Sequence, residues 1–299
     1  MKYNNKKFSN NIYNLLKKTL LISQKIQHDY FLSDIKQISH KENKYMDIVI
    51  INEIQSNLHY QYNVLFSYKN IDFYIKIIFD RLPLKVNEYI RYMKWIICLC
   101  LDNIDNKIKK EINFSLYLTN LKKEIYSNSN VVKSIHCISG FSSYNNNLDV
   151  CIYRKEEWLK VLMHETFHNL GLEFGQMNID TLKVKIKKLF PIESEFALYE
   201  SWAESWALIM NTALCAYKML DDSKKKVDFV LYYEFLILNE KKFTCLQVVK
   251  ILNHMNLTYD MLINPDMKEQ VNQLYRENTN VFAYFIVKLL LVFNDNKFI

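Results

Sequence analysis

The stretch from Lys160 to Gly171 constrains the fold more than any other part of this 299-residue chain. It reads Lys-Val-Leu-Met-His-Glu-Thr-Phe-His-Asn-Leu-Gly, and together with the residues before it, it is apolar on more than one side of a helix. A helix that is apolar nearly all round is buried against other elements. We therefore predict a buried helix from Arg154 to Leu170, ended by a glycine that favours the left-handed backbone of a helix C-terminus.

This helix carries the pattern His-Glu-x-x-His at residues 164–168. Residues i and i+4 share one face of a helix, so His164 and His168 can present two imidazoles to one metal ion. A catalytic zinc site has three protein ligands and a fourth position open to water. Glu165 is placed where a general base acts on a water activated by the metal. The pattern predicts a Zn²⁺ site with Glu165 as the catalytic residue.

The third ligand has to come from outside this helix. The spacing His-Glu-x-x-His-x-x-Gly-x-x-His would put a histidine at position 174, and Phe174 excludes it. Glu200 lies 32 residues after His168 (200 − 168) and is followed at i+4 by Glu204, so one can bind the metal while the other supports its ligands. We predict Glu200 as the ligand and Glu204 as an orienting residue, with the reverse left open. Glu173 is a poorer candidate because it would have to fold back past the glycine that ends the helix.

Elsewhere, the pattern of residues predicts a mostly helical chain with a small mixed sheet. Only 3 Gly and 3 Pro argue against a turn-rich all-β protein. Runs of β-branched and aromatic residues predict a hairpin at 58–66 and 71–79 and strands at 112–118 and 148–153, the last after a turn at 145–147. Helical spacing predicts helices within 1–40, after Pro83 to about Asp102, from Pro191 towards Leu220, and through the C-terminal part with a break near Pro265.

The fold class is therefore α+β. Residues 1–110 are predicted as a helical and hairpin region packed on a core of residues 111–299, or both as parts of one single domain. The net charge of +7 is scattered without an arginine-rich stripe, so we expect no nucleic-acid partner. Six cysteines without a Cys-x-x-Cys pair indicate buried free thiols in a reducing compartment.

The chain begins with a polar stretch and not with the apolar core of a signal peptide. The longest apolar run, 281–293, is interrupted by Lys288 and is too short to span a bilayer. We expect a soluble, intracellular protein with no membrane partner, and leave its oligomeric state open.

The residues assembled here resemble the zincin-type metallopeptidases of the gluzincin kind, in which a following helix completes His-Glu-x-x-His, often through Glu-x-x-Ala-Glu. Glu200-Ser201-Trp202-Ala203-Glu204 matches that setting. The resemblance implies a zincin-like core, peptide-bond hydrolysis, the zinc ligands His164, His168 and Glu200, and the base Glu165. More narrowly, residues 153–168 are similar to a poorly characterised family of metallopeptidases from large DNA viruses, which implies a location in the host cytoplasm or the virion. The similarity covers about residues 113–211.

A peptidase also needs a place for an extended peptide or protein substrate and a donor to the oxyanion. The strand at 148–153 is the predicted partner of the substrate. The donor is left open among four residues, which are Tyr217, Tyr232, Tyr233 and His254. The alternative function is that of a catalytically silent structural or interaction protein with the same fold, such as a virion component.

Overall fold

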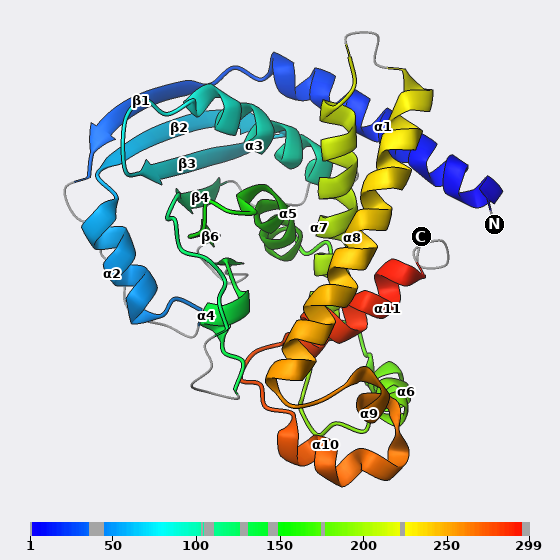
Figure 1. Ribbon diagram of the computed structural model, residues 1–299. Coiled ribbons are helices and arrows are strands. Elements are labelled where there is room, and N and C mark those ends of the chain that lie inside the picture. Colours follow the sequence, from blue (N-terminus) through cyan, green and yellow to red (C-terminus); the bar gives the residue numbers. More distant parts are fainter. Residues whose placement is uncertain are drawn as a thin grey trace.

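A six-stranded mixed sheet with the order β1-β2-β3-β4-β6-β5 organises the computed structural model (Figure 1). The structure describes residues 2–35, 45–102, 104, 111–125, 131–142, 149–174, 177–221 and 225–294, so the turn predicted at 145–147 lies outside the described residues. The strands are β1 (Asp29–Asp34), β2 (Tyr60–Tyr68), β3 (Ile71–Phe79), β4 (Glu111–Tyr117), β5 (Gly140–Ser142) and β6 (Asp149–Ile152).

The predicted hairpin is confirmed, because β2 and β3 pair in antiparallel fashion from Tyr60 opposite Phe79 to Tyr68 opposite Ile71. β4 and β6, both predicted as strands, continue the sheet in parallel, and β5 pairs with β6 in antiparallel fashion at the edge. Two strands were not predicted. β1 lies in a region read as helix and is a strand because it pairs with β2, and β5 is only three residues long, too short for a pattern.

Helices cover both faces of this sheet and form a long C-terminal extension (Figure 1). They are α1 (Lys2–Lys25), α2 (Ile48–Asn57), α3 (Val86–Leu101), α4 (Ser134–Cys137), α5 (Trp158–Asn169), α6 (Asp180–Leu189), α7 (Leu198–Lys218), α8 (Lys226–His254), α9 (Tyr259–Ile263), the 3₁₀ helix η1 (Pro265–Met267), α10 (Lys268–Leu274), the π-helix η2 (Phe282–Val287) and α11 (Lys288–Phe293). The structure is thus α+β with helix predominating, as predicted.

Two predicted helix starts are wrong. The helix expected from Arg154 begins at Trp158, and the helix expected from Pro191 begins at Leu198, since residues 191–197 are not helical. α6, which was not predicted, occupies part of the sequence between the two. The predicted end is confirmed: Gly171 follows α5 with a left-handed φ of 63°.

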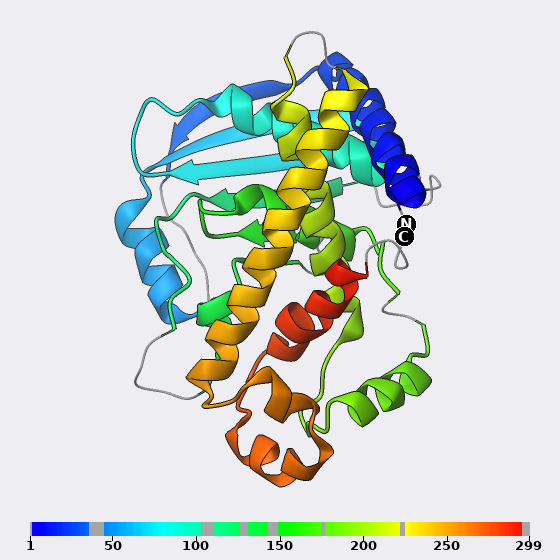
Figure 2. The ribbon, with the colours of Figure 1, turned by 45° about the vertical axis from the view of Figure 1, so that its right-hand side comes forward.

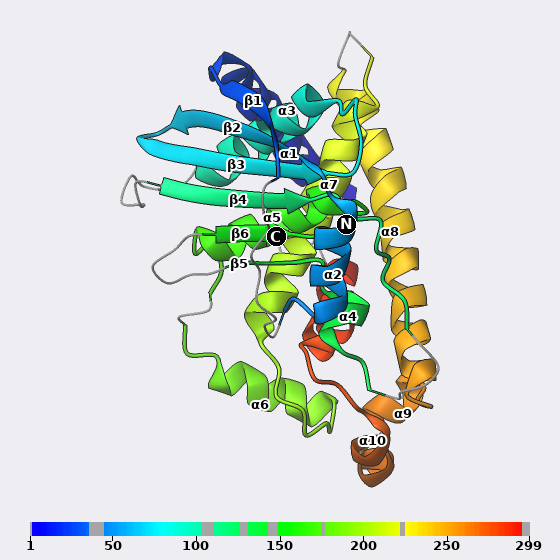
Figure 3. The same ribbon diagram turned by 90° about the vertical axis from the view of Figure 1, so that its left-hand side faces the viewer.

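The core has two parts because side chains alternate across β3. Ile75 and Ile77 point into one buried cluster, to which α1, α3, α5, α7 and the first half of α8 contribute, while Ile78 points into a second cluster formed with α2 and the C-terminal helices. Strands from both sides of residue 110 share this one sheet (Figure 3). The division into two regions at that residue stays a prediction.

All six cysteines are free thiols, and four of them are buried: Cys98, Cys100, Cys137 and Cys151. In the described part of the chain, no helix combines the length and the apolar character that crossing a bilayer requires.

Candidate metal centre

Helices α5 and α7 pack against each other and supply the polar side chains of the candidate site. Leu162 and Met163 are completely buried and anchor α5 in the core. On α7, Ala203 and Ala207 are also completely buried, and side chains this small allow the two helices to approach closely. The polar residues of the two helices are therefore held on rigid elements.

Three donor atoms converge between these helices. Nε2 of His164 lies 2.9 Å from Nε2 of His168, and Oε2 of Glu200 lies 3.3 Å from the first and 3.1 Å from the second. Donors about 2.0–2.2 Å from a tetrahedral ion are roughly 3.3–3.6 Å apart, so the observed spacing is close to that of a metal site. His164 is buried and the other two are half-buried. This group could hold a metal ion, and Glu200 lies where the sequence predicted the third ligand.

The second ring nitrogen of each histidine faces another carboxylate. Oε2 of Glu204 lies 3.2 Å from Nδ1 of His164, and the carboxylate of Glu173 contacts Nδ1 of His168. Histidines that bind metals usually direct their other nitrogen to a carboxylate, which fixes the ring and the tautomer. Glu204 therefore has the orienting position predicted for it. Glu173 does fold back after α5, to support a histidine and not as a member of the three-donor group.

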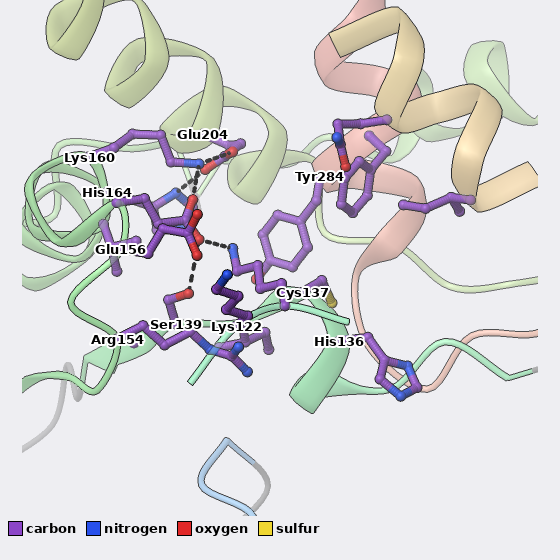
Figure 4. Close-up of a pocket in the computed structure, with 18 of the residues that line it drawn as sticks. Lys122, His136, Cys137, Ser139, Arg154, Glu156, Lys160, His164, Glu204 and Tyr284 are labelled. Atoms are coloured by element: carbon purple, nitrogen blue, oxygen red, sulfur yellow. Dashed lines mark hydrogen bonds and ion pairs between the residues drawn. The ribbon is translucent and has the colours of Figure 1, made fainter. Parts of the chain in front are cut away.

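Two lysines form ion pairs with Glu204, and one of them, Lys160, is labelled in Figure 4. Nζ of Lys160 lies 2.7 Å and Nζ of Lys288 lies 3.3 Å from its Oε1. Burial alone would raise the pKa of Glu204, but these two cations and His164 hold that pKa well below the usual value. Burial likewise opposes ionisation of Glu200, and the two histidines outweigh it, so that its pKa is also lowered. Both carboxylates are anionic at neutral pH.

Glu165 is buried beside the three-donor group and below the edge strand β5. Burial raises the pKa of Glu165 above the usual value, although the two histidines and a hydrogen bond with Ser142 act in the opposite direction. Gly140 explains how β5 comes so close. A Cβ there would lie 2.7 Å from the carbonyl oxygen of Cys151 and 2.9 Å from Cγ1 of Val161, distances that real side chains do not adopt.

Two adjoining cavities give access to this group. The smaller, about 170 Å³, is lined by the three donors, Glu165, β5 and Tyr199. The larger, about 520 Å³, opens beside it and is shown in Figure 4. Ile138, Gly140, His164, Glu165 and Tyr284 line both. The arrangement leaves room for an extended ligand that passes over Glu165 from one cavity into the other.

None of the four predicted oxyanion donors lines the smaller cavity. Tyr217 and Tyr233 pack in the core against Phe229, Tyr232 is exposed on α8, and His254 lies at the end of that helix. The tyrosines that line the cavity are instead Tyr45, Tyr199 and Tyr284. The ring of Tyr284 lies 6.1 Å from that of His164, and burial together with Glu200 and Glu165 raises its pKa well above the usual value, so its hydroxyl keeps its proton.

Comparison with known proteins gives no match, either to a family model, to a curated protein or to a solved structure. The geometry of this chain alone carries the functional argument.

Sequence reasoning missed β5, Tyr284 and the two lysines. One signal was present for Lys160, which precedes His164 by four residues and therefore shares its helix face. Another was Lys288, a lone charge in the apolar run 281–293, because a lysine within such a run is buried only when it is paired. Nothing in the pattern singled out Tyr284 or a strand of three residues.

Proposed function

We propose that this protein is a zinc-dependent metallopeptidase with a zincin-like core. The observation that carries the proposal is that three side chains that could bind a metal ion converge beside a buried glutamate and close to β5, the last strand of the sheet. Two imidazoles and one carboxylate are a donor set that zinc prefers, and three ligands leave one position open. A site built only to stabilise a fold usually closes all four positions with protein ligands.

Each residue then has a defined role. A bound zinc ion supplies a Lewis acid that polarises the substrate carbonyl and lowers the pKa of water. His164, His168 and Glu200 hold it, while Glu204 and Glu173 fix the two imidazole rings. Glu165 takes a proton from the attacking water and passes it to the leaving amine. Burial shifts the pKa of Glu165 upward, which is the direction that favours both steps, because a group that acts first as a base and then as an acid works best when its pKa lies close to the pH of the reaction.

The substrate strand has to be reassigned. β6, the strand predicted at 148–153, lies between β4 and β5, so both of its edges already carry hydrogen bonds. Its first predicted residue, Leu148, lies outside the described residues. Among the described strands, β5 pairs only with β6, so no described strand lies along its other edge. An extended peptide can add to that edge through main-chain hydrogen bonds and lie over Glu165.

Tyr284 is the proposed donor to the oxyanion. It lines both cavities and lies on a π-helix, a local distortion that is frequent at functional sites. Tyr284→Phe should lower kcat about 10²- to 10³-fold with little change in KM, as loss of one oxyanion donor does. Tyr199→Phe is the matched control, because Tyr199 lines the same cavity. An equal loss of kcat in both variants would contradict the assignment of Tyr284.

The deciding experiment compares Glu165→Gln with His164→Ala. Zinc content is measured by atomic emission, and cleavage of a diverse peptide library is followed by mass spectrometry. Glu165→Gln should retain about one zinc per chain and lose cleavage, whereas His164→Ala should lose both. Glu88→Gln, on the exposed start of α3, is the control. If the Glu165→Gln variant still cleaves peptides, the proposed mechanism is wrong. If the parent protein binds zinc but cleaves no peptide of the library, the structural alternative is favoured.

A further inference from the structure

Helix α8 has two apolar faces, and the rest of the described chain covers only one of them. The inner face is buried against α1, α7, α11 and η2, through Phe229, Tyr233, Ile237, Thr244, Val248 and Ile251. In Figure 2 this helix, coloured yellow to orange, crosses the front of the molecule along its whole length. Its other face therefore points to solvent.

Six large apolar side chains on that other face form what we call the outer stripe. Each is at least half exposed: Val227 70%, Leu231 59%, Phe235 63%, Leu238 52%, Leu246 65% and Val249 50%. At 1.5 Å per residue the stripe is about 33 Å long. Single exposed apolar residues are ordinary on a protein surface, but a row of them of this length, interrupted on its face by Lys242, indicates an interaction site.

We propose that the outer stripe binds the outer stripe of a second copy of this chain, with the two α8 helices antiparallel. The steps of three and four residues that separate most of its members are those of a helix–helix seam. The stripe is also nearly symmetric about its middle, at Leu238. A two-fold axis there sets Leu231 opposite the partner's Leu246, and Phe235 opposite the partner's Lys242, whose aliphatic stem can cover the ring.

The charges beside the stripe support this orientation. On the flanks of the stripe, the first half of α8 carries Asp228 and Glu234, and the second half carries Lys241 and Lys250. The helix also carries Lys226 at its start, Glu240 at its middle and Lys242 within the stripe. Around the same two-fold axis, Asp228 lies opposite the partner's Lys250 on one flank, and Glu234 lies near the partner's Lys241 on the other. A parallel pair would bring each acidic half beside the partner's acidic half, and like charges placed together disfavour association.

The composition of the flanks also argues against a membrane as the occupant. Helices that lie in a lipid interface carry mostly Lys and Arg on their polar side. The flanks of the outer stripe are acidic in one half and basic in the other. A single helix pair is at the small end of specific interfaces, so the expected dimer is reversible, with a Kd in the micromolar range.

A charge-swap experiment on the full chain tests the proposal. Sedimentation velocity at low salt should show a concentration-dependent dimer for the parent. Asp228→Lys and Lys250→Asp should each weaken it at least tenfold, because each puts like charges opposite one another at two places in the dimer. The double variant should recover. An equimolar mixture of the two single variants should form a heterodimer, in which both pairs are again opposite in sign.

The mixture distinguishes an antiparallel pair from unspecific association. Leu238→Glu, at the centre of the stripe, should abolish dimers, while Lys187→Asp on the exposed side of α6 should leave them unchanged and serves as the control. A parent that stays monomeric at hundreds of micromolar overturns the proposal. In that case binding to vesicles or to another protein becomes the alternative to test. A mixture that associates no better than either single variant also overturns the proposal, and a dimer built in another way becomes the alternative.

Discussion

Two glutamates that are largely shielded from solvent lie at the two ends of η2. The surroundings of one favour its neutral form, and the surroundings of the other favour its anion. At the start, Oε2 of Glu277 accepts a hydrogen bond from the backbone N–H of Phe282 at 2.9 Å. Its other donors are also neutral, and burial raises the pKa of Glu277 to about 7. Just after the end, Glu204 faces Lys288 and also Lys160, and its pKa is well below the usual value.

The comparison shows that burial does not decide the charge of a carboxyl group by itself. Both groups lose solvation, which favours the neutral form. Glu204 remains anionic because two cations are within ion-pair distance, and Glu277 does not because its neighbours are a phenol and backbone amides. The anionic carboxylate of Glu204 faces Nδ1 of His164, where a carboxylate can fix the orientation of the imidazole ring. Between the two fixed ends of η2 lies Tyr284, so both glutamates help to position it.

The largest expected effect comes from Glu204→Gln. It leaves Lys160 and Lys288 without their shared anion in a buried place, and breaking such a group costs about 3–5 kcal/mol. Urea unfolding followed by tryptophan fluorescence measures it. Glu195→Gln is the matched control, because Lys187 and Glu195 are also 2.7 Å apart but exposed, and surface pairs contribute little. Equal losses in the two variants would mean that the lysines behind Glu204 do not depend on it.

A smaller effect is expected on metal affinity, and it rests on the proposed zinc site. Glu173→Gln and Glu204→Gln should each lower zinc affinity about 10- to 100-fold, as loss of a carboxylate behind a histidine ligand does. Glu277→Gln should leave it unchanged, since that residue contacts neither histidine. Competition with a chromophoric chelator measures the three affinities. A loss in Glu277→Gln as large as in Glu173→Gln would show that the effect is not carried by the histidine rings.

How much of this could be predicted from the sequence depends on whether the interaction is local. The helical spacing of His164, His168 and their apolar neighbours predicted the centre of α5, and i,i+4 spacing placed Glu200 and Glu204 on one face of a second helix while leaving open which of them belongs to the three-donor group. The hairpin of β2 and β3 also follows from local alternation. These features can be predicted because each depends only on the spacing of residues within a single helix or strand.

The remaining features depend on contacts between distant segments. β1 and β5 are strands because a neighbouring strand pairs with them, and their own sequences are too short or too exposed to show it. Tyr284 reaches the site only through the packing of η2 on α7, some 80 residues earlier in the chain. The tyrosines chosen from the sequence, Tyr217 and Tyr233, lie on equally apolar helices, and nothing in a single sequence distinguishes a core tyrosine from one that faces a cavity.

The smallest effect is a change in how stability depends on pH. The pKa of Glu277 is about 7 in the folded chain and near 4.5 when exposed, so between these values the unfolded chain is ionised while the folded chain keeps its proton. Stability should therefore fall as the pH rises through this window and level off above pH 7. The pKa shift corresponds to a change of about 3 kcal/mol in the free energy of unfolding. Because the side chain is only half-buried and solvent screens part of the effect, we expect a loss of stability of roughly 2 kcal/mol across this pH window.

Glu277→Gln removes that dependence, because glutamine does not titrate. The other ionisable groups facing Glu277 are Tyr275 and Cys137, and since burial raises the pKa of both, neither titrates below pH 8. The variant should match or fall slightly below the parent at pH 5, where both side chains are neutral in the folded chain and the unfolded parent is only partly ionised. It should exceed the parent by about 1 kcal/mol at pH 8, after the loss of one hydrogen bond. Urea unfolding at pH 5, 6.5 and 8 measures the difference. A variant less stable than the parent at pH 8 would mean that Glu277 is held as an anion like Glu204, and the contrast between the two ends of η2 would disappear.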